Sequence, residues 1–222
     1  MARPRVLITG FGPFPGVPEN PSARLAEQLA AQAALDRDAE LHPLVLPTEW
    51  QSAALMPDLC ARLQPHVMIH FGLCQRANSL RIERFAHNRA ARRADAGGAL
   101  PASAAICLDG PDRLDTTLPI PALAAHLRRS GFAAATSHSA GRYLCNFLYY
   151  HSLGWARRND GLAVFIHIPP VSRNDPFSES TLLGGAREIL RFVLDFAQAG
   201  ATAQTANRSA FAAPQHLFGA KA

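Results

Sequence analysis

The sequence alternates short apolar runs, many of them β-branched, with longer segments of helical periodicity, and this alternation constrains the fold more than any other feature. Strands separated by helices pair in parallel, because a parallel connection needs the length of a crossover. The expected strands lie at Val6–Thr9, Ala39–Leu46, His66–Phe71, Phe132–Ser137 and Leu162–Ile168. The expected helices lie at Ser22–Leu35, Thr48–Leu63, Pro121–Arg129, Arg142–Trp155 and Thr181–Gln198. The pattern predicts an α/β fold, a three-layer α/β/α sandwich with a twisted, mostly parallel open sheet.

Two of these helices begin with recognisable capping signals. Asn20 precedes Pro21 and Ser22, so a capping side chain stands before a proline in the first turn. Thr48 and Gln51 form the Thr-x-x-Gln pattern of a capping box.

The alternation breaks down from Leu73 to about Leu118, where arginine, alanine and glycine dominate and large apolar residues are few. An insertion of this length is more often a functional loop or lid than a plain connection. No linker divides the chain, so we expect one domain over residues 1–222. From about residue 200 the chain is rich in Ala, Thr, Gln and Asn, which indicates a loosely ordered tail over 200–222.

Charge and composition exclude several classes of protein. Lys+Arg number 22 and Asp+Glu 17, a formal net charge of +5, but Lys221 is the only lysine and the arginines are scattered. This pattern lacks the basic block of a nucleic-acid-binding arm, so we expect no nucleic-acid partner. No apolar run approaches the ~18–20 residues of a membrane span, and we expect no membrane partner. The first residues run straight into a strand pattern without a secretory leader, so we expect a cytoplasmic protein with reduced thiols.

One of the four cysteines is placed for chemistry. None of them forms a CxxC pair, which excludes a zinc knuckle or a dithiol redox motif. Cys145 follows an apolar strand and a small-residue turn, and stands where the next helix begins. The positive end of a helix dipole favours a thiolate there, and substrates of open α/β sheets bind at the carboxyl ends of strands. A free cysteine is nevertheless most often a small buried hydrophobic residue, and that interpretation stays open.

A thiolate nucleophile needs a base, and the base needs an orienting partner. His167 lies near the end of an apolar strand and is the best placed of the nine histidines, although a buried hydrogen-bonded histidine is the plainer interpretation. Glu83 is the candidate that orients it, as the acid of a triad does, although it could equally belong to a solvated surface pair with Arg84. His66 and His70 share one strand face, but no third ligand accompanies them and packing explains them better than a metal site.

Taken together, these segments resemble the type I pyroglutamyl peptidases, also called pyrrolidone-carboxylate peptidases, over about residues 5–195. The resemblance rests on motifs in family order: Thr9–Phe14 with Asn20-Pro21-Ser22, Glu83–Asn88, Asp109-Gly110-Pro111 with Thr116–Pro119, Ser137–Tyr150, and Phe165–Pro169. The segment around Cys145 is the most diagnostic of them.

The resemblance implies a role for each matched residue. Cys145 is the nucleophile, His167 the general base and then acid, and Glu83 the carboxylate that orients His167. Arg93, together with the backbone N–H of Cys145, is implied to hold the oxyanion. The implied substrate-binding residues are Phe11, Phe14, Asn20 and Tyr143, with the two phenylalanines enclosing the pyroglutamyl ring.

The implied reaction is acyl transfer, in which Cys145 attacks the amide carbonyl after an N-terminal pyroglutamate and water then hydrolyses the thioester. The resemblance implies no metal and no cofactor, a peptide substrate, and a homo-oligomer, either a tetramer or a dimer. Leu73, Arg81 and the adjacent Arg92 and Arg93 depart from the usual family pattern around the substrate mouth. The unusual segment from Leu73 to Arg81 motivates an alternative, a catalytically altered relative that binds a lactam or peptide end or cleaves a different amide.

Overall fold

A six-stranded sheet forms the centre of the molecule, in a computed structural model that describes residues 3–33, 39–171 and 177–211. In spatial order its strands are β2 (Glu40–Leu46), β1 (Arg5–Phe11), β3 (Val67–Leu73), β8 (Leu162–Ile168), β4 (Leu80–Glu83) and β7 (Ala134–Ser137). The first four are parallel to one another. The strand β4 is antiparallel to β8 and parallel to β7. The expected mostly parallel sheet is confirmed.

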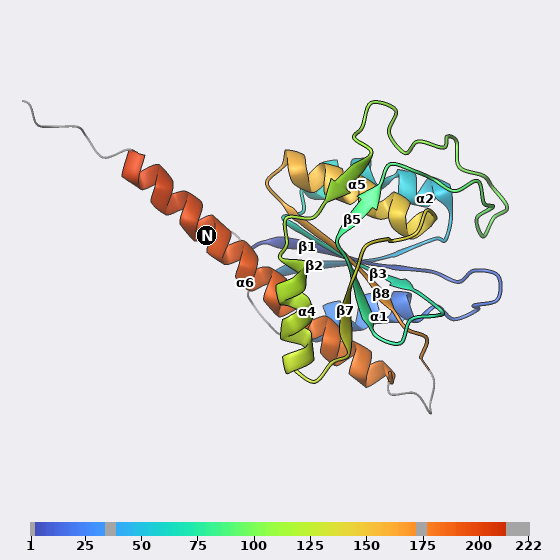
Figure 1. Cartoon of the computed structure of the whole chain (residues 1–222), viewed down its shortest axis with the longest axis horizontal. Coiled ribbons are helices and arrows are strands. Elements are labelled where there is room, and N and C mark those ends of the chain that lie inside the picture. The colour runs from blue at the N-terminus through green and yellow to red at the C-terminus, as the bar shows by residue number, and fades with distance from the viewer. Residues whose placement is uncertain (1–2, 34–38, 172–176, 212–222) are drawn as a thin grey trace, which may run out of the picture.

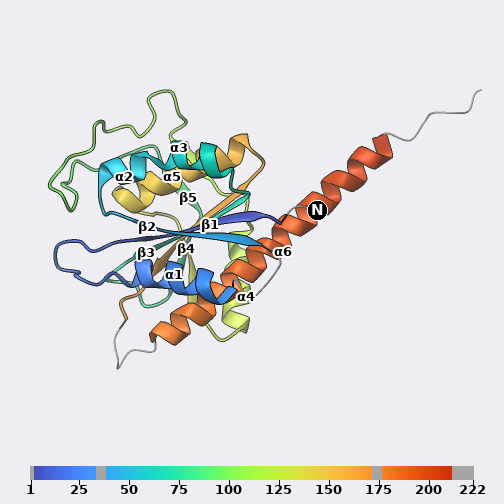
Figure 2. The ribbon, with the colours of Figure 1, turned by 180° about the vertical axis from the view of Figure 1, so that it is seen from behind.

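Helices cover both faces of this sheet (Figures 1 and 2). One layer consists of α1 (Pro21–Ala33), α4 (Ile120–Arg129) and α6 (Glu179–Phe211). The other consists of α2 (Trp50–Ala54), α3 (Met56–Leu63) and α5 (Leu144–Arg158). Each layer closes its own hydrophobic core against the sheet, so the α/β/α sandwich is confirmed.

The central strands are apolar on both faces, which explains why their sequences read as continuous apolar runs. In β1, Val6 and Ile8 pack into the core with α1 and α6, whereas Leu7 packs toward α5. In β8, Ile166 and Phe165 divide in the same way between the two cores. Both faces of the sheet therefore need a helical layer.

The segment expected to be a long loop contains three short strands. Leu80 and Ile82 of β4 are buried in the sheet, while β5 (Phe85–His87) and β6 (Arg113–Asp115) form a separate antiparallel pair. Because these short strands contain arginine and glutamate, a hydrophobicity pattern does not predict them as strands. Residues 88–112 form the irregular remainder, a long excursion beyond α2 and α5 (Figure 1).

Of the two capping signals, the one at Asn20 is confirmed and the one at Thr48 is wrong. The side chain of Asn20 accepts a hydrogen bond from the backbone N–H of Ser22 at 3.1 Å. Thr48 instead donates its hydroxyl to the carbonyl of Gly12 at 2.9 Å. The start of α2 is capped from outside the helix, because the backbone N–H of Trp50 donates to the carboxylate of Asp95 at 2.9 Å.

The last helix is longer than the periodicity indicated. Its apolar face ends near the expected boundary at Gln198, but α6 continues to Phe211 and its C-terminal part projects away from the body (Figures 1 and 2). The expected tail over 200–222 therefore begins as helical backbone, and 212–222 lie outside the described residues. Within the part of the chain that is described, no helix combines the length and apolar character needed to cross a membrane.

Candidate active site

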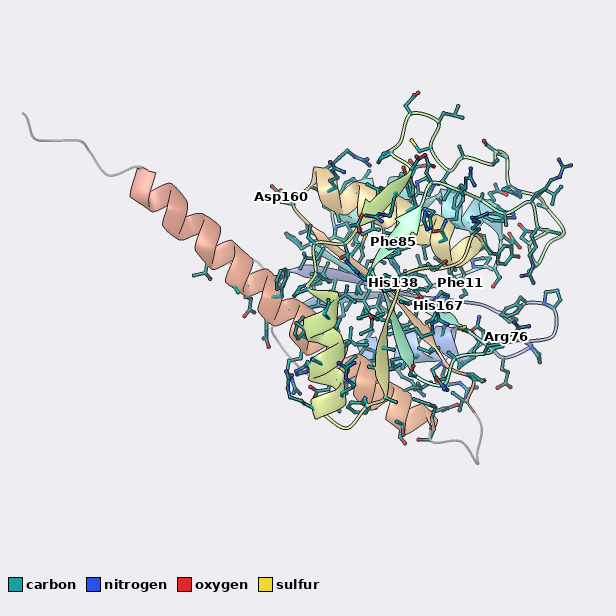
Figure 3. All side chains as sticks on the ribbon, in the orientation of Figure 1. Phe11, Arg76, Phe85, His138, Asp160 and His167 are labelled. Atoms are coloured by element: carbon teal, nitrogen blue, oxygen red, sulfur yellow. The ribbon has the colours of Figure 1, made fainter. Side chains whose placement is uncertain are left out.

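The carboxyl ends of β3 and β8 meet the first turn of α5. Gly72 pairs with His167 across these two strands, and Cys145 stands in the first turn of the helix. A Cβ atom on Gly72 would lie 3.1 Å from the Cys145 sulfur and 2.8 Å from the ring of Phe165. Only glycine lets the thiol approach the strand this closely. Figure 3 labels Asp160, which precedes β8, and His167, near the carboxyl end of that strand.

Cys145 reaches this edge by a route that differs from the expected one. The sequence analysis placed the thiol at the carboxyl end of the preceding strand, but β7 runs opposite to β8. The end of β7 at Ser137 is therefore level with Glu83, away from the carboxyl edge of β8. Residues 138–143 lead the chain back to that edge before α5 begins.

Glu83, His167 and Cys145 form a row across this edge. The Nδ1 atom of His167 lies 2.8 Å from a carboxylate oxygen of Glu83, and both side chains are buried. Cys145, half-buried, lies on the other side of the imidazole within hydrogen-bonding reach. Burial alone lowers the pKa of His167, but negative charge on Cys145 and Glu83 outweighs it and raises the pKa to about 10. The arrangement favours a protonated imidazole beside the Cys145 sulfur and the Glu83 carboxylate.

The Glu83 carboxylate has few other partners. Its side chain is fully buried, and its second oxygen finds no hydrogen-bond donor among the described residues. The hydroxyl of Tyr149 donates to the backbone carbonyl of Glu83 at 3.0 Å, which holds the strand and not the side chain. A buried carboxylate that has a single hydrogen-bonding partner relies on the positive charge of that partner to offset the cost of its burial.

The end of β1 and the loop that follows it carry three of the expected substrate-binding residues. Phe11 is buried at the end of the strand, and Phe14 is half-buried in a short bridge with Val17. Figure 3 labels Phe11 at the same end of the sheet as His167. Asn20 donates its side-chain amide to the carbonyl of Gly12 at 3.0 Å while its oxygen binds Ser22. The side-chain amide of Asn20 thus makes its hydrogen bonds within the loop, where it stabilises the loop conformation.

Tyr143 and Arg93 lie together beside the start of α5. Tyr143 immediately precedes the helix and donates its hydroxyl to the carbonyl of Ala94 at 3.0 Å. The guanidinium of Arg93 lies 4.8 Å from the centre of the Tyr143 ring, and Trp50 packs edge-on against that ring at 5.1 Å. The exposed cation of the 88–112 segment therefore contacts the residue that immediately precedes α5.

Asp95 supports this part of the site and had no role in the sequence analysis. Its carboxylate accepts hydrogen bonds from the backbone N–H groups of Trp50, Gly97 and Ala99 at 2.8 to 3.0 Å. Burial raises the pKa of Asp95, but these bonds to the charged form outweigh it, so the net pKa lies below the usual range. The glycine-rich segment beside Arg93 is therefore held in one shape. The Asp-x-Gly-Gly pattern, typical of a side chain that caps its own turn, was the available signal.

The two histidines near the start of β3 pack separately. His70 is fully buried, its Nδ1 lies 2.8 Å from the Thr9 hydroxyl, and burial lowers its pKa to about 3. His66 lies before β3 and accepts a hydrogen bond from the backbone N–H of Arg5 at 3.1 Å. Across the described residues, no three His, Cys, Asp or Glu side chains form a group that could hold a metal ion.

Comparisons with known proteins identify the family. The family model described as pyroglutamyl peptidase matches residues 4–176. The human protein named pyroglutamyl-peptidase 1 is 31% identical over 200 residues, covering 88% of this chain and 93% of its own. The pyrrolidone-carboxylate peptidase of Chromobacterium violaceum is 38% identical over 167 residues, covering 74% of this chain and 77% of its own.

Solved structures give the same answer for the fold. A mutant pyrrolidone carboxyl peptidase from the hyperthermophile Pyrococcus furiosus superposes with a TM-score of 0.79 at 28% identity, covering 87% of this chain and 99% of its own. Sequence relatives and structural relatives thus coincide on one family and on most of this chain's length. The chain belongs to the pyroglutamyl peptidase family.

Proposed function

We propose that Cys145, His167 and Glu83 make this chain a cysteine exopeptidase that hydrolyses the amide bond after an N-terminal pyroglutamyl residue. The observation that carries the proposal is the row of these three side chains, with His167 bound to Glu83 at 2.8 Å and next to the thiol. Nucleophile, base and orienting acid in one row are what acyl transfer requires. Family membership supplies the substrate, because the relatives are named for pyroglutamyl peptides.

In the first half of the reaction, the sulfur of Cys145 attacks the carbonyl carbon of the pyroglutamyl residue. His167 is already an imidazolium beside the sulfur, since its pKa is raised to about 10. The imidazolium then donates its proton to the departing amine, and the C–N bond breaks to leave a thioester on Cys145. In the second half, neutral His167 removes a proton from water, which attacks the thioester and releases free pyroglutamate.

Two sources of positive potential support the oxyanion. The first backbone N–H groups of α5 have no acceptor within the helix, and no side chain caps them. The N–H of Cys145 is one of these groups, so it is positioned to donate to a developing oxyanion beside its own sulfur. We assign Arg93 a supporting role through its contact with Tyr143, the residue that immediately precedes α5.

Phe11 and Phe14 are proposed to bind the flat, uncharged lactam ring between aromatic surfaces. The hydrogen bonds of Asn20 hold the loop that carries both rings, so Asn20 acts on the substrate by keeping that loop in place. Tyr143 forms the neighbouring wall at the start of α5. A pocket built for a lactam strongly rejects residues that lack one, because its polar groups would then stay unpaired.

Three further proposals rest on the sequence and the family resemblance. We assign the chain one cysteine-peptidase domain over 1–222 with a loosely ordered tail over about 200–222. We assign it to the cytoplasm, which agrees with the absence of a membrane-spanning helix from the described residues. We also expect a homo-oligomer, dimer or tetramer.

The test is release of aminocoumarin from pyroglutamyl-aminocoumarin by the purified, reduced protein. Cys145→Ser is expected to lower kcat by about 10⁴-fold or more, as removal of a nucleophile from a triad does. Cys107→Ser is the matched control, because Cys107 is an exposed thiol on the 88–112 segment. Equal activity in the wild type and Cys145→Ser would refute the assignment. Tight binding of a pyroglutamyl peptide with no thioester in mass spectrometry would instead favour the catalytically altered relative.

A further inference from the structure

Arg81 lies beside the proposed catalytic base but has no role in the proposed reaction. In the antiparallel pairing of β4 with β8, Arg81 lies directly opposite His167. Residues opposite each other in such a pair project from the same face, with Cβ atoms about 4.5–5.5 Å apart. Glu83, two residues further along β4, projects from this face too and binds His167. Arg81 is thus a neighbour of the base.

The guanidinium of Arg81 has unused binding capacity. It is half-buried and donates one hydrogen bond, to the hydroxyl of Ser137 at 3.1 Å. Within residues 3–33, 39–171 and 177–211, no carboxylate forms an ion pair with it, since Glu83 is directed to His167. A guanidinium offers five donors in a planar fork that matches a carboxylate. A cation beside the reacting groups with a single neutral partner is suited to bind an anion from the substrate.

The order of the strands shows which part of the substrate meets Arg81. Across the face that carries the site, β1, β3, β8 and β4 follow one another. They bring Phe11, then Gly72 with Cys145, then His167, then Arg81 into one line. With the lactam ring at Phe11, the scissile carbon lies at Cys145 and the departing amine at His167. The residue after the scissile bond therefore continues over β4.

We infer that Arg81 binds a carboxylate on the departing part of the substrate. This inference rests on the proposed function, which places the lactam ring at Phe11 and the amine at His167. The carboxylate is either the side chain of an acidic residue that follows the pyroglutamate or the free C-terminus of a pyroglutamyl dipeptide. Both present a carboxylate, at slightly different distances from the scissile bond. Arg81 is accordingly a specificity-determining residue of the leaving-group side.

The test compares pairs of substrates that differ by one charge. Pyroglutamyl-glutamate amide against pyroglutamyl-glutamine amide probes a side-chain carboxylate. Pyroglutamyl-alanine against its amide probes a C-terminal one. The wild type is expected to favour the charged member of at least one pair about five- to tenfold in kcat/KM, the size of a partly exposed ion pair. Added salt should reduce this ratio, because the pair is partly solvated.

Three variants separate a local contact from a general charge effect. In Arg81→Gln the ratio is expected to fall to about one, and in Arg81→Lys to recover in part, because lysine restores the charge but not the fork. Arg157→Gln removes the same charge from the last turn of α5, at the far end from Cys145, and should keep the wild-type ratio. A mere structural role for Arg81 would change both members of a pair equally. The inference would be overturned if the wild type cleaved the charged and the neutral member of each pair equally well. It would also be overturned if Arg81→Gln left the ratio unchanged.

A binding measurement separates this inference from the proposed function. In a Cys145→Ala background, calorimetry with the same peptides should give a Kd ratio that depends on Arg81 in the same way. If the peptides bind with that ratio while the wild type cleaves none of them, the proposed function fails and the role of Arg81 stands. If cleavage occurs but neither cleavage nor binding depends on the charge, the role of Arg81 fails alone. Absence of both binding and cleavage overturns both.

Discussion

At the residue scale, the proposed chemistry depends on the bond between Glu83 and His167. The carboxylate is fully buried and one of its oxygens has no donor among the described residues, so its charge is compensated mainly by the imidazolium. His167 in turn stays protonated because Glu83 and Cys145 both favour its charged form, against a burial that disfavours it. Glu83 and Cys145 therefore both act on the protonation state of His167.

Replacing Glu83 by glutamine should uncouple this row. The change keeps the shape but removes the charge, so the pKa of His167 should fall from about 10. We expect kcat to fall about 10³–10⁴-fold, the cost of a comparable acid-to-amide change in a serine triad. The alkaline limb of the pH–rate profile should also move to lower pH. An unchanged alkaline limb would show that Glu83 does not orient or charge the base.

The raised pKa of His167 also predicts a pH dependence of stability. A group with a folded-state pKa of about 10 and an ordinary value of 6.5 contributes stability that is complete below about pH 6.5. That contribution is lost as the pH rises through about 10. Thermal unfolding between pH 6.5 and 10 should therefore show a falling Tm in the wild type and a shallower fall in His167→Gln. Parallel curves for the two proteins would contradict the assignment.

At the element scale, the site is a junction between strand ends and a helix start. Glycine at position 72 lets α5 lie close enough to β3 for Cys145 to face His167. Asp95 joins the 88–112 segment to the first turn of α2 through the hydrogen bond from the backbone N–H of Trp50, and holds its own turn through those from Gly97 and Ala99. Both contacts, at Gly72 and at Asp95, connect elements that are distant in the sequence.

Gly72→Ala should impair catalysis more than folding. The added methyl group would lie 3.1 Å from the sulfur and 2.8 Å from the Phe165 ring, so the thiol must shift. Misplacement of a reacting atom by about 1 Å costs on the order of 10²-fold in kcat. Gly154→Ala in the same helix as Cys145 is the control, because its nearest neighbour is the flexible end of Arg158 at 3.4 Å. Steady-state kinetics and circular dichroism of both variants decide the matter, and full activity in Gly72→Ala would refute this account.

Asp95→Ala should lower the free energy of unfolding by about 1–2 kcal/mol, the usual cost of a lost helix cap. Because the pKa of Asp95 lies below its usual range, its contribution is present above the ordinary aspartate pKa and lost as the pH falls through the lower folded value. Urea denaturation at pH 7 measures the difference. Asp109→Ala, an exposed aspartate on the same segment, should cost less than about 0.5 kcal/mol. Equal losses in the two variants would exclude the capping role of Asp95.

At the scale of the whole molecule, the alternating pattern predicts the layers and the parallel half of the sheet correctly. It fails at β4, because a four-residue strand that contains arginine and glutamate carries too little apolar periodicity. The pattern also does not predict that β7 runs opposite to β8, since strand direction depends on pairing partners and not on local sequence. Cys145, His167 and Glu83 were identified from motifs. Gly72 was not, because its role follows from contacts with distant elements, and the part of Asp95's role that depends on α2 was hidden for the same reason.

The tail offers a test of the proposed domain limits. In the described part of α6 the last fully buried side chain is Val193, and the helix beyond it projects from the body (Figure 1). A chain that ends at Ala199 should therefore keep its activity and a Tm within about 2 °C of the full chain. Differential scanning calorimetry and the aminocoumarin assay check this. A drop of 10 °C or more would show that residues 200–222 belong to the folded unit.

The placement of β4 between β8 and β7 has a consequence for the folding chain. Glu83 and His167 are separated by 84 residues and meet only when β8 pairs with a strand that runs against it. Closing so long a loop is slow, and no shorter stretch of chain contains the complete row. A nascent or partly unfolded chain thus carries the thiol without its charged base, so hydrolysis begins only when the last central strand has joined the sheet.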